Sequence, residues 1–282
     1  MEYFGLDDFL LAALKEDVGT GDITTNSCIP EKNRSYGEFV AKSEGVVCGL
    51  DVAKRVFELV DPLIEFTELM QDGDFANKGD IIARVEGPSR GILTGERVAL
   101  NIMQRLSGTA TATARAVDQV RGSKARIVDT RKSTPGLRTL EKYAVRTGGG
   151  HNHRFNLADG VLIKDNHIRA AGGIAQAISA VRENVPHVMK IEIETETLDQ
   201  VREALDAGAD IIMLDNMSNE LMSEAVKLIS GRALTEASGN MGERELSEVA
   251  ATGVDVISIG ALTHSVKAMD ISLKFRLKEV GT

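Results

Sequence analysis

The sequence predicts an α/β fold: a TIM-like (β/α) barrel, complete or incomplete, preceded by an N-terminal α+β sandwich domain. From about residue 125 onward, short apolar runs alternate with amphipathic helical patterns. Continuous apolar strands between helices are typical of a parallel sheet that helices cover. The later repeats follow one another about every 22 residues, which is close to the minimum for one strand and its helix. At least six such units predict a closed or nearly closed barrel.

Residues 1–105 follow a different pattern and are expected to form the smaller domain. An amphipathic segment, DDFLLAALKEDVG, precedes two strand-like pieces, YGEFVAKSEGVVCG and IEFTELMQDGDFANKGDIIARVEG, which Gly-Asp turns interrupt. Such turns predict a small antiparallel sheet. A helix with Val98, Ile102 and Leu106 then leads into the barrel, which we expect over residues 106–269. A C-terminal helix over about 270–282 is expected to pack back on the first domain.

Six apolar runs are the expected barrel strands: ARIVDTRK, GVLIKDNH, MKIEIETE, DIIMLDNM, RALTEASGN and VDVISIGALTH. Helical spacings lie between them, as for Leu198, Val201 and Leu205. Thr197 and Gln200 form a capping box at the start of that helix.

The composition restricts the ligand and the compartment. The chain of 282 residues carries a formal net charge of -9, so its surface as a whole repels nucleic acid and anionic membranes. No apolar run is long enough to span a bilayer, and Met1–Glu16 has no basic region before its apolar residues. Cys28 and Cys48 have no metal-ligand spacing and fit a reducing compartment. We expect a cytoplasmic protein.

Polar residues follow the apolar part of every expected strand. Turns favour Gly, Asn, Asp and Ser, whereas here Lys and Glu also occur inside otherwise apolar runs. Barrels build their active sites at these carboxyl ends, so the set indicates function more than chain turning. The positions are Asp129 to Lys132, Lys164 to His167, Glu194, Asp215, Glu236 to Asn240, and Gly260.

One stretch, residues 130–154, concentrates positive charge in this acidic chain. Its single acid is Glu141. Because the chain as a whole is acidic, the local cluster predicts a small anionic ligand rather than a nucleic acid. The cationic residues are Arg131, Lys132, Arg138, Lys142, Arg146 and Arg154, and the stretch also contains His151 and His153.

The last two strands and two acidic residues indicate which anion is bound. Small residues at Ser238, Gly239 and Gly260 let backbone N–H groups approach a phosphate, as in many barrels. Glu194 and Asp215, on neighbouring strands, offer the hard oxygen ligands that Mg²⁺ prefers. Alternatively, these two acids form buried ion pairs with Lys190 or Lys164. The combination favours a phosphorylated sugar and a second, carboxylated reactant.

Long contiguous motifs resemble those of the quinolinate phosphoribosyltransferase family. The central one is RKSTPGLRTLEKYAVRTGGGHNHRFNLADGVLIKDNHI. EDVGTGDITT near the start, GERVALNIMQRLSG at the junction and SIGALTHSVKAMDISL near the end match in the same order, so the resemblance covers nearly the whole chain. It implies conversion of quinolinate and 5-phosphoribosyl 1-diphosphate to nicotinate mononucleotide, diphosphate and CO2, with Mg²⁺, in NAD biosynthesis.

The same resemblance implies roles for particular residues of this chain. Arg131, Lys132, His153 and Arg154 match the quinolinate pocket, with Thr130 beside them, and Lys164 matches the same charged cavity. Glu194 and Asp215 match positions around the ribose hydroxyls and the magnesium ion. The 5-phosphate loops are matched by Ser238, Gly239, Asn240, Gly260 and Ala261. We expect catalytic roles for Lys132, Lys164, Glu194 and Asp215.

Arg97, on the helix before the barrel, is expected in a pocket of a neighbouring subunit. This implication makes the protein a homo-oligomer, either a dimer or a hexamer built as a trimer of dimers. From the sequence alone, Arg97 reads as a solvated helix arginine.

Other functions are compatible with parts of the pattern. A class I aldolase would use Lys164 as a Schiff-base lysine, which leaves the other cations unexplained. A molybdenum-transport-associated relative of the same fold would bind a ligand without turnover, and a related phosphoribosyltransferase would act on nicotinate without decarboxylation. Quinolinate and nicotinate tested side by side separate these possibilities.

Overall fold

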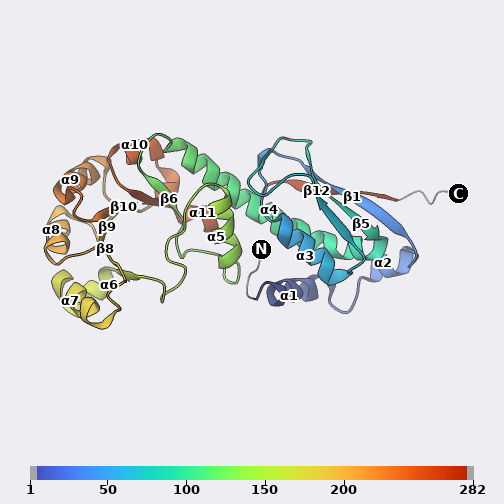
Figure 1. Cartoon of the computed structure of the whole chain (residues 1–282), viewed down its shortest axis with the longest axis horizontal. Coiled ribbons are helices and arrows are strands. Elements are labelled where there is room, and N and C mark those ends of the chain that lie inside the picture. Colours follow the sequence, from blue (N-terminus) through green and yellow to red (C-terminus); the bar gives the residue numbers. More distant parts are fainter. Residues whose placement is uncertain (1–4, 278–282) are drawn as a thin grey trace. The chain divides into compact units, whose positions relative to one another are not determined.

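The computed structural model describes residues 5–277, and the chain divides into two compact units (Figure 1). The described residues of Met1–Ala112, Thr139–Gly148 and Val266–Thr282 form the first unit. Thr113–Arg138 and Gly149–Ser265 form the second. The expected boundaries lay at residues 105 and 269. The first unit therefore also takes a segment from the middle of the expected barrel sequence.

In the first unit, four of the described strands form an antiparallel sheet in the order β12-β1-β5-β3, and β2 and β4 pair separately. Phe39 of β1 is fully buried, and its ring centroid lies 6.1 Å from that of Phe57 and 5.6 Å from that of Phe66. These ring contacts pack the sheet against the helix that carries Phe57. The strands are β1 (Arg34–Ala41), β3 (Glu65–Glu68), β5 (Ile81–Pro88) and β12 (Ile271–Leu277).

The other elements of the first unit are mostly helices. Helix α3 was not predicted, although Val52, Val56 and Phe57 form a buried stripe along it. The Asp72 carboxylate accepts the Gly49 N–H at the start of α3 at 2.9 Å. The elements are α1 (Leu6–Val18), α2 (Ile23–Cys28), α3 (Leu50–Val60), α5 (Arg138–Thr147), the short strands β2 (Gly45–Val46) and β4 (Phe75–Ala76), and α4 (Ser89–Gln119), which continues into the second unit.

The prediction of a helix over about 270–282 was wrong. Residues 271–277 form strand β12, which pairs antiparallel with β1 from Ile271 opposite Ala41 to Leu277 opposite Ser35. The physical reason is a period of two, because apolar Ile271, Leu273 and Phe275 alternate with polar residues. Residues 278–282, the rest of the expected helix, lie outside the described residues.

All six predicted barrel strands are present in the second unit. They form a parallel sheet in the order β6-β11-β10-β9-β8-β7. In Figure 1, α8, α9 and α10 lie on the outer side of β8, β9 and β10. The strands are β6 (Arg126–Val128), β7 (Val161–Ile163), β8 (Ile191–Thr195), β9 (Ile211–Asp215), β10 (Leu234–Ser238) and β11 (Val256–Ser258).

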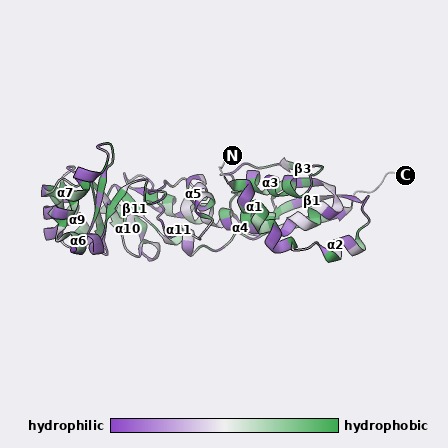
Figure 2. Cartoon of the chain, turned by 90° about the horizontal axis from the view of Figure 1, so that it is seen from below, coloured by the Kyte–Doolittle hydropathy of each residue, from purple (hydrophilic) through white to green (hydrophobic). Residues whose placement is uncertain are grey.

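Two of the helices in this unit, α8 and α9, begin at side-chain caps. Thr197 Oγ1 accepts the Gln200 N–H at the start of α8, as the capping pattern predicted, and Ser218 Oγ accepts the Leu221 N–H at the start of α9. In Figure 2, α7 and α9 carry both hydrophilic and hydrophobic residues, as expected for helices with one buried face. The helices are α6 (Asp165–Ala171), α7 (Ile174–Asn184), α8 (Leu198–Asp206), α9 (Asn219–Ile229), α10 (Leu246–Ala251) and α11 (Ala261–His264), with a 3₁₀ turn η1 at Met241–Glu243.

The six-stranded parallel sheet does not close on itself in the described residues, because β6 and β7 are its two edges. One isolated parallel bridge joins Val128 at the end of β6 to His151. The segment that follows His151 therefore lies beside the edge of the sheet, where a fully closed barrel would continue. Across residues 5–277, no helix has the length and apolar character needed to cross a bilayer.

Candidate active site

The second unit contains a cavity of about 790 Å³ at the carboxyl ends of its parallel strands. Side chains on a strand alternate between its two faces, so residues two apart point to the same side. Because of this alternation, the last inward-facing residues of successive strands surround the same cavity. The inward pairs that line it are Leu162 and Lys164, Met213 and Asp215, Glu236 and Ser238, and Ser258 and Gly260.

Asp129, directly after β6, holds the segment that contains His153 by hydrogen bonds. Its fully buried carboxylate accepts the His153 N–H at 2.9 Å and the Asn152 Nδ2–H at 2.6 Å. The His151 N–H donates to Ile127 O at 2.9 Å. These bonds hold the segment 151–154 beside β6 and direct His153 and Arg154 into the cavity lining.

The loop after β6 presents Lys132 from a fixed backbone. Thr263 Oγ1 donates to Lys132 O at 2.6 Å, and the Lys132 N–H donates to Thr130 Oγ1 at 3.0 Å. Arg138 Nε donates to Ser133 Oγ at 2.8 Å. The hydroxyl groups and Arg138 therefore brace the loop, and the Lys132 side chain lines the cavity.

Arg131 and Arg154 bring two guanidinium groups to the same cavity. Burial and the positive charge of Arg131 lower the pKa of Arg154, against the opposing charge of Glu192. Arg154 Nη1 donates to Gly160 O at 2.8 Å, whereas Arg131 Nε is buried without a hydrogen-bond partner in the described part of the chain. Two guanidinium groups that repel each other and retain an unused donor favour a bound anion.

Lys164 and Glu194 form an ion pair at the opposite wall, with 2.9 Å between Nζ and Oε2. The pairing of Glu194 with Lys164 that the sequence left open is therefore present, but the lysine side chain is 46% exposed, so the pair is not a buried structural one. His167 Nδ1 accepts the Lys164 N–H at 2.9 Å. His167 thus holds the start of α6 and does not line the cavity.

Glu194 and Asp215 stand at the ends of neighbouring strands, β8 and β9, and both line the cavity. Asp215 Oδ2 accepts the Asn216 Nδ2–H at 2.6 Å. Two carboxylates beside an open, polar space are the donor set that Mg²⁺ takes when it also keeps water and substrate oxygens. The residues present fit a magnesium ion.

The loops after β10 and β11 consist of small residues. Gly239 has φ +94°, and a Cβ at this position would collide with the side chain of Asn216. A Cβ at Gly260 would lie 3.0 Å from Lys132 Cδ. The backbone therefore comes close to the cavity at both loops, which suits the binding of a phosphate group.

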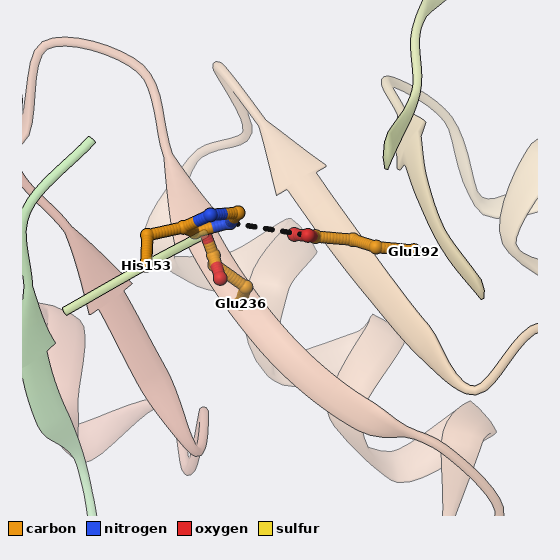
Figure 3. Close-up of side chains that lie close together, drawn as sticks. All are labelled: His153, Glu192 and Glu236. Carbon is orange, nitrogen blue, oxygen red and sulfur yellow. Dashed lines mark ion pairs between the residues drawn. The ribbon is translucent and has the colours of Figure 1, made fainter. Parts of the chain in front are cut away.

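Beneath these groups lies a cluster of His153, Glu192 and Glu236 (Figure 3). His153 Nε2 lies 3.1 Å from Glu192 Oε2 and 3.7 Å from Glu236 Oε1. Both carboxylates are at least 95% buried. Burial first, and then the negative charge of Glu192, raise the pKa of Glu236 well above its usual range, against the opposing effects of His153 and Ser258.

The structure brings together all of the predicted site residues except Arg97, which is exposed on α4 in the first unit. Only part of the basic stretch lines the cavity of the second unit. Lys142 is buried and Arg146 is exposed, and both belong to α5 in the first unit. The residues that line the cavity are Thr130, Arg131, Lys132, His153, Arg154, Lys164, Glu194, Asp215, Ser238, Gly239, Asn240, Gly260 and Ala261.

Some residues at the site were not predicted, and Glu236 was marked only as one of the polar strand ends, with no role assigned. Glu236 lines the cavity and Glu192 lies behind it. The signal for both was in the strands: Glu192 and Glu194 are two residues apart in IEIET, as are Glu236 and Ser238 in TEAS, so each pair shares a face. Asn216 and His264 also line the cavity, and no local pattern marks them.

Two family models match the chain: "Quinolinate phosphoribosyl transferase, N-terminal domain" over residues 22–107 and its "C-terminal domain" over residues 109–274. A probable nicotinate-nucleotide pyrophosphorylase [carboxylating] of Bacillus subtilis is 47% identical over 98% of this chain and 96% of the relative. The chloroplastic enzyme of that name from Arabidopsis thaliana is 44% identical over 96% of this chain and 83% of its own length. The crystal structure of NadC from Streptococcus pyogenes is 43% identical, with a TM-score of 0.93 over 99% of this chain and all of that one.

Proposed function

This chain belongs to the quinolinate phosphoribosyltransferase family, and we propose that it carries out the decarboxylating reaction of de novo NAD biosynthesis. Quinolinate and 5-phosphoribosyl 1-diphosphate are converted to nicotinate mononucleotide, diphosphate and CO2. The proposal rests on the names of relatives that match nearly the whole chain and on the charges of the cavity.

The observation that carries this proposal is the set of four cationic side chains in one cavity: Arg131, Lys132, Arg154 and Lys164. Quinolinate carries two carboxylates, and the sugar donor carries a phosphate and a diphosphate. Removing such anions from water without compensating positive charge would be prohibitive. Arg131 and Arg154 suit the carboxylates, because a guanidinium can donate two parallel hydrogen bonds to one carboxylate.

In this scheme the protein positions two reactants and compensates charge. The pyridine nitrogen attacks the ribose carbon as diphosphate leaves, and Lys132 and Lys164 stabilise the negative charge of the leaving group. The small loops at Ser238, Gly239, Asn240, Gly260 and Ala261 bind the 5-phosphate. No covalent bond to a protein nucleophile is required.

We include a magnesium ion in the proposal, held by Glu194 and Asp215 together with substrate oxygens. Bound there, Mg²⁺ would neutralise part of the charge on the departing diphosphate. The carboxylates also face the ribose, where they can accept hydrogen bonds from its hydroxyl groups.

Decarboxylation follows from the product of the first step. The ring nitrogen becomes positively charged, so the electrons of the adjacent carbon–carboxylate bond can move to the ring carbon as CO2 leaves. Nicotinate has no carboxylate at that position. A second carboxylate site is therefore what distinguishes this activity from that of a non-decarboxylating phosphoribosyltransferase.

We also propose that the protein acts as a homo-oligomer, a dimer or a trimer of dimers, in which Arg97 completes the site of a neighbouring subunit. Arg97 is exposed on α4, and its carboxylate-binding chemistry matches that of Arg131 and Arg154.

The cavity does not favour an aldolase. A Schiff-base lysine must react as a neutral amine, whereas Lys164 Nζ forms an ion pair with Glu194. The test of the proposed function compares quinolinate and nicotinate as acceptors, with the same donor and Mg²⁺. Formation of nicotinate mononucleotide with quinolinate but not with nicotinate supports the proposal. Turnover of nicotinate alone indicates the non-decarboxylating enzyme, and binding of quinolinate without turnover indicates the transport-associated relative.

A further inference from the structure

The cluster of His153, Glu192 and Glu236 contains more hydrogen-bond acceptors than donors. Glu192 Oε1 and Glu236 Oε1 are buried and have no hydrogen-bond partner among the described residues. Figure 3 shows the His153 ring beside both carboxyl groups, one from β8 and one from β10. A buried polar atom without a partner indicates a missing proton, ion or ligand.

The hydrogen bonds of His153 decide between a metal ion and a proton. The Arg154 N–H donates to His153 Nδ1 at 2.7 Å, so Nδ1 acts as the acceptor of the neutral ring. Nε2 then carries the hydrogen and directs it to Glu192 Oε2 at 3.1 Å. A metal ion would need the Nε2 lone pair, which this tautomer does not offer. The arrangement therefore favours a proton.

Glu236 is the group that holds this proton. His153 Nε2 lies closer to Glu192 Oε2 than to Glu236 Oε1, so its single hydrogen is directed to Glu192. Two ionised carboxylates buried side by side would repel each other. The other groups that face Glu236 are the Ser258 hydroxyl on β11 and, in register on β9, the apolar Met213. The direction of the Glu236 pKa agrees, because burial and Glu192 both raise it.

Position in the cavity also distinguishes Glu236 from Glu192, although both side chains are almost fully buried. Glu236 lines the cavity, two residues before Ser238 on the same face of β10, whereas Glu192 is not part of the lining. Arg131, His153 and Arg154 line the same cavity. A proton on Glu236 is therefore available to an acceptor bound beside these residues.

We propose that the Glu236 carboxyl group donates the proton that replaces the departing CO2 on the pyridine ring. This inference rests on the proposed function. In this step the carbon–carboxylate bond breaks, its electron pair stays on the ring carbon beside the charged nitrogen, and a carbon–hydrogen bond forms with the Glu236 proton. The Glu236 carboxylate then takes up a proton from water in the open cavity before the next turnover. Without this donor the carbanion recaptures CO2, so net decarboxylation slows.

Single-turnover measurements on Glu236→Gln test the proposal. The variant keeps the size of the side chain and removes its acidity. We expect diphosphate release to continue, CO2 release to slow by about 10²-fold, and the mononucleotide that still carries both carboxylates to accumulate. Glu224→Gln, the same change at an exposed position of α9, is expected to release the two products together. The proposal would be overturned if a folded Glu236→Gln protein released diphosphate and CO2 at equal rates, whether or not both rates were lower than those of the wild type.

The pH dependence of the wild type provides a test that does not depend on a variant folding. As the pH rises and Glu236 loses its proton, CO2 release should fall behind diphosphate release. Glu192→Gln keeps a hydrogen-bond acceptor for His153 but removes the negative charge that raises the pKa of Glu236. In this variant CO2 release should therefore begin to fall behind diphosphate release at a lower pH. A constant ratio of the two rates across pH 6 to 9 contradicts the proposal. A wild type that releases no diphosphate with quinolinate instead contradicts the proposed function itself.

Discussion

Lys164 Nζ lies 2.9 Å from Glu194 Oε2, so the ends of β7 and β8 are joined by an ion pair in the cavity wall. A partly exposed pair of this kind contributes about 0–1 kcal/mol to stability. Both partners also face the space in which we place the diphosphate and the ribose. Their main contribution should therefore be to the reaction, and it can be separated from stability by experiment.

Lys164→Ala should keep the fold and lose activity by about 10²-fold or more, because it removes a cation that stabilises the leaving group. Lys124→Ala is the matched control. Lys124 forms a similar partly exposed pair with Asp255, at 2.6 Å, and does not line the cavity. The two variants should unfold at similar temperatures and differ in kcat. A large loss of thermal stability in Lys164→Ala alone would assign this lysine a structural role.

Glu194→Gln should raise the Mg²⁺ concentration needed for half-maximal activity and weaken binding of the sugar donor more than binding of quinolinate. The change removes one negative charge and retains an oxygen. Mg²⁺ titrations of activity and separate Kd measurements for the two substrates provide the test, with Asp199→Asn at an exposed position of α8 as the control. If both substrates bind equally less well, the metal assignment fails.

Gly239→Ala should weaken donor binding and destabilise the protein by about 1–3 kcal/mol. The left-handed φ of +94° disfavours alanine, and the added methyl group would collide with Asn216. Gly208→Ala separates the two effects, because Gly208 has φ +80° and a methyl group added there would meet no atom within 4 Å. Urea unfolding and donor Kd are the measurements. Equal donor Kd values for the two variants would mean that the loop after β10 does not bind the donor.

Stability should fall as the pH rises through the titration of Glu236. Between the ordinary carboxyl pKa and the raised pKa of Glu236, the folded protein holds a proton that the unfolded chain has released. The unfolding free energy then decreases by up to about 1.4 kcal/mol per pH unit. Glu236→Gln should lack this decrease. Urea unfolding of both proteins from pH 5 to pH 8 gives the comparison, and parallel pH profiles would contradict it.

Mixing two inactive homodimers tests the role proposed for Arg97. Arg97→Ala and Lys164→Ala proteins are combined under conditions that let subunits exchange. In each hybrid, one site has native Lys164 and receives native Arg97 from its partner. About half the dimers become hybrids with one sound site of two, so activity should recover to roughly a quarter of wild type. No recovery, with exchange verified by mass spectrometry, would show that Arg97 acts within its own subunit or not at all.

The parallel sheet could be predicted because each buried strand carries its own signal. The apolar parts of IIMLD and VLI are apolar on both faces of the strand. The polar residue at the end of each run marks the edge of the sheet where the cavity lies. This local pattern located Lys164, Glu194 and Asp215, which the fold then brings to one cavity.

Other features depend on contacts between distant segments. The stretch 271–277 was expected to lie in a helix; its alternation of apolar and polar residues indicates a strand, but its pairing with β1, more than 200 residues earlier, depends on the fold. Helix α5 lies within the basic stretch, but its residues Lys142 and Arg146 belong to the first unit, whereas Arg131 belongs to the second. The role of Glu236 depends on Glu192 and His153, which are far away in sequence and become neighbours only in the folded sheet.

Quinolinate labelled with ¹⁴C in the carboxylate beside the ring nitrogen gives the most direct test of the proposed reaction. The wild-type protein, the sugar donor and Mg²⁺ are incubated with this substrate, and labelled CO2, diphosphate and nicotinate mononucleotide are measured. The proposed function predicts equal amounts of all three products, with the label entirely in CO2. Label retained in the final mononucleotide, or diphosphate released with nicotinate but not with quinolinate, would contradict it.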